Sequence, residues 1–145
     1  MKILISFLLF FVHFNIFAAG TYDTIDASKE YQKAENLINN KDFKGAIKVL
    51  KDLMIEDPKG YTKADLYNYL GFATRKQSNP DYELAESYYL KALEINNNHI
   101  GAMEYLGELY FETDRRDEAL VLLNRIKMVA GDNSSEFKDL NKLLN

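Results

Sequence analysis

The sequence contains the tripeptide Tyr-Leu-Gly twice, at residues 69–71 and again at residues 105–107. Each copy is followed by an alanine and, four positions later, by a large residue: Ala85 with Tyr89, and Ala119 with Leu123. The tripeptides are displaced by 36 residues (107 minus 71) and the alanines by 34 (119 minus 85), because the turn within the first copy is longer. Internal similarity at this period is typical of stacked two-helix units.

The spacing of apolar residues predicts that both halves of each unit are helical. Residues 64–77 and 82–95 carry apolar side chains three and four positions apart, which is the period of one helix face. The sequence Ser-Asn-Pro-Asp between them predicts a turn, with Pro80 at the opening of the second helix. Residues 99–112 and 118–130 repeat the arrangement around a turn at 113–117, and no segment alternates as a strand does. The prediction is an all-α chain.

This pattern resembles the tetratricopeptide repeat (TPR) family over nearly all of the chain after residue 20. The resemblance rests on the two Leu-Gly pairs and on the alanines with their large partners. An earlier, degenerate copy has Ala34, Ala46 and Leu50 in the corresponding positions, with Lys33 in place of leucine. The family implies an α-solenoid of three helix-turn-helix repeats and a C-terminal capping helix. The predicted ranges are 27–60, 64–99 and 100–133 for the repeats and 134–144 for the capping helix.

Small residues are expected where paired helices approach most closely. Glycine inside a helix costs about 0.5–1 kcal/mol relative to alanine, so Gly71 and Gly107 require a packing reason. We expect Gly107 to face Ala119, and Gly71 to face Ala85, across each helix pair. For the capping helix, Ser134 or Ser135 is expected to serve as the N-cap.

Residues 1–20 have the order of a secretory signal peptide. Lys2 precedes an apolar run that ends in the small residues 18–20. The run is shorter than the roughly 20 apolar residues of a membrane-spanning helix, and a retained anchor is the weaker alternative. Together with the Asn-rich and Lys-rich composition, this leader favours export to the periplasm of a Gram-negative bacterium. The whole pattern resembles small secreted bacterial TPR proteins.

Composition excludes several classes of function. The chain has no cysteine, which removes disulfides, thiolate zinc sites and cysteine nucleophiles. The net charge of -4 argues against nucleic-acid binding. His99 stands alone in a loop, without the partners of a metal site, and is expected to be solvated. With no catalytic motif present, we predict no enzyme activity, no cofactor and no metal.

The family resemblance places binding on the concave wall formed by the first helix of each repeat. Ten residues are predicted to line this groove: Tyr31, Glu35, Asn68, Tyr69, Phe72, Arg75, Glu104, Tyr105, Glu108 and Phe111. The rings of Tyr69 and Tyr105 are expected to stand side by side. The clamp that some TPR proteins use for acidic peptide ends needs basic and amide side chains, and its positions here hold Tyr31, Glu35, Tyr69, Gly101 and Tyr105. Glutamates outnumber the basic residues on the wall, which favours a partner with apolar anchors and basic residues.

Two functions fit these observations. The first is a non-enzymatic periplasmic adaptor that binds a protein or peptide in its groove. The alternative is a structural subunit of an obligate envelope complex, which could associate with itself. The sequence leaves the oligomeric state open, and membrane contact is expected only through an uncleaved leader.

Overall fold

A computed structural model describes residues 26–145, and within this range the chain is entirely helical, as the sequence predicts. The signal peptide predicted at residues 1–20 lies outside the described residues. None of the helices formed by residues 26–145 is long and apolar enough to cross a membrane. The elements are α1 (Ala27–Asn39), α2 (Phe43–Asp52), the 3₁₀ helix η1 (Leu53–Ile55), α3 (Lys63–Lys76), α4 (Tyr82–Ile95), α5 (Ile100–Glu112), α6 (Arg116–Ala130) and α7 (Ser135–Leu144).

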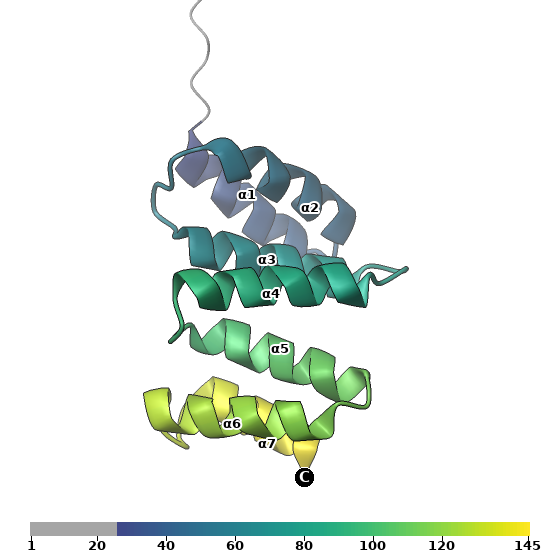
Figure 1. The fold of residues 1–145 in the computed structure, drawn as a ribbon. Helices are drawn as coiled ribbons and strands as arrows, with labels where there is room; N and C mark the ends of the chain where they lie inside the picture. The colour runs from purple at the N-terminus through teal and green to yellow at the C-terminus, as the bar shows by residue number, and fades with distance from the viewer. Residues whose placement is uncertain (1–25) are drawn as a thin grey trace, which may run out of the picture.

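The helices are stacked in chain order, as Figure 1 shows. α1 packs on α2, α3 on α4, and α5 on α6, while α7 packs against both α5 and α6 at the C-terminal end. The second helix of each pair also contacts the first helix of the next, so α2 joins α3 and α4 joins α5. This connectivity is that of a solenoid, in which neighbouring units supply the core that a single pair cannot form.

Polar side chains begin most of the helices. Asp26, Asp42, Asp81 and Ser134 each accept a hydrogen bond from a backbone N–H of the first turn. Such caps satisfy donors that have no partner within the helix. Asp81 takes the N-cap of α4, so Pro80 precedes the helix and does not open it as predicted. Of the two serines expected to cap α7, Ser134 does so.

The apolar residues form two clusters. The first lies among α1, α2, η1 and α3, and the second among α4, α5, α6 and α7. The partly buried ring of Tyr67, on α3, packs against both. The two clusters are thus divided between the helices of the central pair, because Leu66 and Leu70 of α3 belong to the first while Tyr89 of α4 belongs to the second.

Gly71 and Gly107, the glycines of the two Leu-Gly pairs, are required by close contacts that the sequence did not indicate. A Cβ atom on Gly71 would lie 2.6 Å from the ring of Tyr89, and one on Gly107 would lie 2.6 Å from Cδ2 of Leu140. Gly71 therefore admits an aromatic ring of its partner helix α4. At Gly107 the nearest atoms belong to Leu140 of the capping helix α7, a neighbour that the sequence did not indicate, and the contact with Ala119 stays a prediction. The sequence repeat conceals this difference because α7 ends the stack and packs directly on α5.

We expect Gly107→Leu to lower the free energy of unfolding by about 1–3 kcal/mol, because the new side chain would overpack the contact between α5 and α7. Adding Leu140→Ala should recover part of this loss by opening space at the same contact, so the two changes are not additive. Urea denaturation of the wild type, both single variants and the double variant measures the coupling. Strictly additive effects would contradict the assignment of Leu140 as the neighbour of Gly107.

Candidate functional site

The first helices α1, α3 and α5 line two adjoining cavities, which together we call the groove. The larger cavity has a volume of about 570 Å³ and the smaller about 350 Å³. Glu35, Tyr69 and Tyr105 line both, so the two cavities meet at these three side chains. Neither cavity is lined by a lysine or an arginine.

Seven of the ten residues predicted to line the groove do so in the structure. Tyr31, Glu35, Asn68, Tyr69, Glu104 and Tyr105 line the larger cavity, and Phe72 lines the smaller one. The other three have different surroundings. Phe111 packs against the second apolar cluster, Glu108 lines a separate hollow beside α7, and Arg75 is withdrawn from the surface.

The tyrosine rings of the groove pair differently from the prediction. Tyr31 stacks on Tyr61 with 4.3 Å between ring centroids and lies 5.8 Å from Tyr69. Tyr105 lies 4.8 Å from Phe72. Tyr69 also donates a hydrogen bond of 3.4 Å to Glu35. The nearest rings to Tyr69 and Tyr105 are thus Tyr31 and Phe72, while both tyrosines line the two cavities of the groove.

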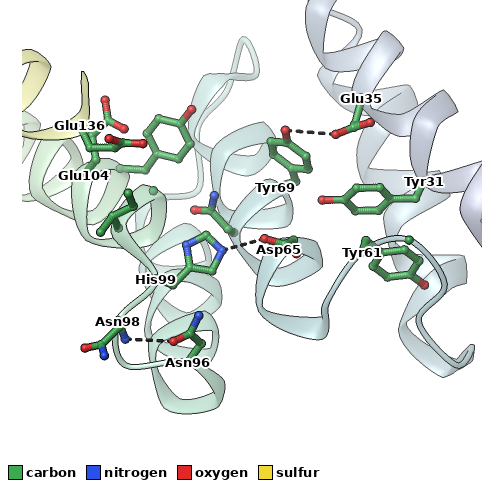
Figure 2. A pocket seen from close by; sticks show the side chains of 15 residues that line it. Tyr31, Glu35, Tyr61, Asp65, Tyr69, Asn96, Asn98, His99, Glu104 and Glu136 are labelled. Carbon is green, nitrogen blue, oxygen red and sulfur yellow. Dashed lines mark hydrogen bonds and ion pairs between the residues drawn. The ribbon is translucent and has the colours of Figure 1, made fainter. Parts of the chain in front are cut away.

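His99 is a structural residue of the larger cavity and not the solvated loop histidine that the sequence suggested (Figure 2). Its Nδ1 accepts a hydrogen bond of 3.1 Å from the backbone of Ala102 and thereby caps α5. Its Nε2 lies 3.1 Å from the carboxylate of Asp65. Because Nδ1 is an acceptor, the proton of the neutral ring is on Nε2 and is donated to Asp65. This bond joins the beginnings of α3 and α5.

Asp65 has a second structural role at the beginning of α3. Its carboxylate accepts hydrogen bonds from the backbone and hydroxyl of Thr62, which completes a capping box. Burial alone would raise the pKa of Asp65, but the bonds from Thr62 and His99 lower it overall. Asp65 and His99 are 34 residues apart. This separation equals the repeat period of 34 residues. The pair could therefore have been found from the sequence by looking for polar residues one period apart.

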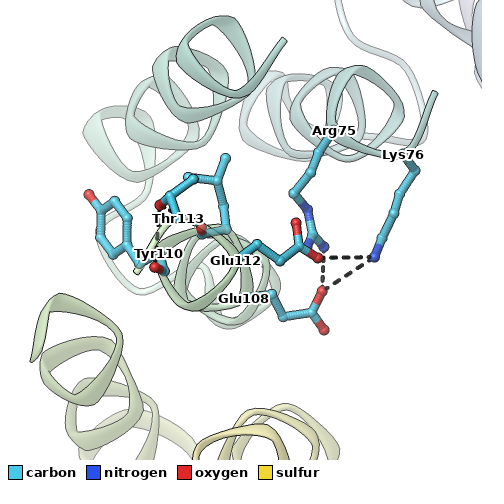
Figure 3. Close-up of polar contacts among 7 residues, drawn as sticks. Arg75, Lys76, Glu108, Tyr110, Glu112 and Thr113 are labelled. Atoms are coloured by element: carbon cyan, nitrogen blue, oxygen red, sulfur yellow. Dashed lines mark hydrogen bonds and ion pairs between the residues drawn. The ribbon is translucent and has the colours of Figure 1, made fainter. Parts of the chain in front are cut away.

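Arg75 holds α3 against α5 through two carboxylates, as Figure 3 shows. Its Nη1 donates to Glu112 over 2.7 Å and its Nη2 to Glu108, while its side chain has no exposed surface. Lys76 adds a longer contact of 3.7 Å to Glu112. The prediction that Arg75 contacts a partner is therefore wrong, because its charge is buried and already paired. Glu108, also predicted to line the groove, is likewise engaged in this ion pair.

Glu104 is the buried carboxylate of the groove that has no such partner. It is 8% exposed, and within residues 26–145 it makes no hydrogen bond or ion pair. Burial raises its pKa to about 7, and the charges of Glu108, Asp139 and Glu136 add to the shift while Arg75 opposes it. Burial also raises the pKa of Tyr105 to about 12, again with a contribution from Glu104. The side of the groove formed by α5 and α7 is therefore strongly acidic.

The arrangement offers surfaces for binding. Within the part of the chain that the structure describes, no three histidine, aspartate or glutamate side chains are placed to hold a metal ion. Tyr61, Asp65 and His99 line the larger cavity although the sequence did not indicate them. Tyr61 belongs to the loop before α3, and its position beside Tyr31 depends on how that loop packs.

Replacing Arg75 with methionine should lower the free energy of unfolding by about 2–3 kcal/mol. Removing one partner of a fully buried ion pair costs about 3–5 kcal/mol, and the loss is smaller here because Glu108 and Glu112 keep contact with water. The matched change Lys76→Met removes an exposed cation and should cost less than about 1 kcal/mol. Equal stability of Arg75→Met and wild type in urea denaturation would show that this bridge does not hold α3 and α5 together.

Glu104→Gln should stabilise the fold in a manner that depends on pH. The folded protein keeps a proton on Glu104 up to about pH 7, whereas the unfolded chain loses it near the ordinary value of 4.5. Ionisation of Glu104 thus destabilises the wild type as the pH rises through this window. We expect the glutamine variant to gain about 1–3 kcal/mol at pH 8, since one pKa unit corresponds to about 1.4 kcal/mol. The gain should vanish below about pH 4.5, and Glu83→Gln on the exposed side of α4 should show no such trend.

Comparison with known proteins gives a family match for the C-terminal half. Residues 78–143 match the family model described as tetratricopeptide repeat, a range that begins before α4 and ends within α7. The predicted first repeat, at residues 27–60, lies outside it. An uncharacterized protein, ycf37 of Porphyra purpurea, is 31% identical over 84 residues. The match covers 57% of this chain and 47% of that protein, so the chain spans about half the length of this curated relative.

Two solved structures have a similar fold. The crystal structure of PcrH in complex with the chaperone binding region of PopB has a TM-score of 0.70 at 17% identity, covering 86% of this chain and 97% of that one. The crystal structure of MamA has a TM-score of 0.64 at 16% identity, covering 82% and 74%. At these identities the likeness concerns the fold alone. The family match thus shows tetratricopeptide repeats at residues 78–143, and the two solved structures share the fold over most of the chain.

Proposed function

We propose that this protein is a non-enzymatic interaction module that binds a segment of a partner protein in the groove formed by α1, α3 and α5. The observation that carries the proposal is the lining of the two adjoining cavities, which combines aromatic rings with carboxylates and contains no lysine or arginine. Such a surface offers apolar contact area and negative charge along one continuous path. It fits a polypeptide with apolar anchors and basic residues.

The aromatic side chains supply the anchoring surface. Tyr69, Phe72 and Tyr105 are only partly buried, and they meet where the two cavities adjoin. Aromatic residues dominate binding energy at protein interfaces because they bury a large area with few rotatable bonds. The structure of PcrH with the chaperone binding region of PopB supports this proposal by analogy, since its fold is similar and its partner is a protein segment.

The proposed location is the periplasm, where the protein would act as an adaptor for envelope proteins. This part of the proposal rests on the leader pattern at residues 1–20. A groove rich in carboxylates would bind basic segments and repel acidic ones, which gives selectivity among exported chains.

Adding positive charge to the groove tests the proposal. Asn36 and Asn39 are exposed residues of α1 that line the smaller cavity. The double variant Asn36→Arg with Asn39→Arg should weaken capture of a periplasmic partner by about tenfold or more. Neither change removes a buried contact, so circular dichroism and the melting temperature should stay close to those of the wild type.

The matched control carries the same two substitutions outside the groove. Asn97 and Asn124 are exposed and line neither cavity. Asn97→Arg with Asn124→Arg adds the same charge and should leave capture unchanged. Equal loss in both double variants would indicate a response to net charge alone. Unchanged capture by the Asn36 and Asn39 variant would remove the groove as the binding surface.

A further inference from the structure

One side of the larger cavity brings together acceptor groups from three helices. Glu104 is 8% exposed and has no polar partner within residues 26–145. Asn68, on the facing helix α3, is 6% exposed, and its carbonyl oxygen Oδ1 is buried without a hydrogen-bond partner. Glu136 of α7 lines the same cavity, and Figure 2 shows its side chain beside that of Glu104. Three helices thus direct acceptors to one place.

A buried acceptor without a partner is costly, and Oδ1 of Asn68 is such an atom. An unsatisfied amide oxygen costs of order 1–3 kcal/mol. The side chain of Glu104 is mostly buried without a bound cation, which disfavours its ionised form. The protein itself offers no cation here, because Arg75 is committed to Glu108 and Glu112. His99 donates its proton to Asp65 and is therefore unavailable as well.

We propose that this place is a subsite for the guanidinium group of an arginine in the partner segment. The inference rests on the proposed function, and it assigns the residue type that the larger cavity takes. A guanidinium has five donors and no acceptor, which is the complement of two carboxylates and an amide oxygen. The lining ring of Tyr105 adds an aromatic face for stacking.

Arginine fits this place better than lysine. A guanidinium is planar, loses less hydration on burial than an ammonium group, and can bond a carboxylate through two parallel N–H groups. The amide oxygen of Asn68 lies on α3, across the cavity from the carboxylates on α5 and α7, so the donors must point in several directions. The fork of a guanidinium provides them from one rigid group.

Binding should depend on pH through Glu104. The groups that influence this carboxylate are Glu108 on the same helix, Glu136 and Asp139 from α7, and Arg75 from α3. Its pKa of about 7 means that much of it is protonated at pH 6 and ionised at pH 8. A guanidinium keeps its charge over this range. Affinity for arginine is therefore expected to rise between pH 6 and pH 8.

The experiment is a titration of the full chain with N-acetyl-arginine amide, followed by the NMR signals of the protein. The compound should bind saturably and shift the backbone signal of Gly101 and the side-chain amide of Asn68, which line the cavity. N-acetyl-citrulline amide has nearly the same shape without the charge and is the matched ligand. Glu104→Gln should weaken arginine binding about tenfold, as expected for a lost charge-assisted hydrogen bond, and should flatten the pH dependence. Glu83→Gln should bind as the wild type does.

Three results would overturn the subsite. They are the absence of saturable shifts with arginine amide, equal binding of citrulline amide, and unchanged affinity in a folded Glu104→Gln variant. Tighter binding of N-acetyl-lysine amide would overturn the assignment to a guanidinium. These outcomes are separate from the test of the groove, because partner capture by the Asn36 and Asn39 variant is measured without the small ligand. If that variant loses partner capture but the wild type does not bind arginine amide, the groove remains the binding surface and only the arginine subsite is overturned.

Discussion

The close approach of α3 to α4 at Gly71 is the contact on which the architecture depends. The two apolar clusters of the molecule meet there, since α3 contributes to the first and α4 to the second. The fully buried ring of Tyr89 fills the space that the missing side chain of Gly71 leaves open. A Cβ atom at this position would collide with a rigid ring and separate the helices. The first of the two Leu-Gly pairs therefore lets α3 and α4 pack closely, and this packing joins the two apolar clusters into a single stack.

The groove depends on the contact between α3 and α4, because its walls are helices that belong to different apolar clusters. α1 belongs to the first cluster and α5 to the second, while α3 lies between them. Two polar contacts then fix α3 relative to α5 at opposite ends: the bond between Asp65 and His99 near their beginnings, and Arg75 with its carboxylates near their ends. These contacts hold α3 and α5 in one arrangement, and a surface that is ordered before binding loses little conformational entropy when it binds.

The repeat period and helical spacing were sufficient to predict the all-helical fold and most of the groove lining. They located the helices because each pattern is local to one helix and occurs more than once. The errors arose where the repeats are not equivalent. Gly107 contacts Leu140 because α7 ends the stack, and His99 is held by Asp65 because two loop ends meet. A period describes what repeats share and carries no information about contacts that only one repeat makes.

Arg75 and Glu104 are both buried charged residues of the wall, but only the charge of Arg75 is paired within the described residues. Both are charged residues in the interior side of the wall, and each is predicted by its helix position to face a partner. Arg75 finds two carboxylates across the helix contact, and its charge serves the fold. Glu104 is surrounded mainly by acids and burial raises its pKa although Arg75 opposes the shift, so its charge opposes the fold when it ionises. The charge of Arg75 is thus paired within the chain, whereas the charge of Glu104 is not paired within residues 26–145. For this reason Glu104, and not Arg75, is the charged wall residue on which our proposal for a partner rests.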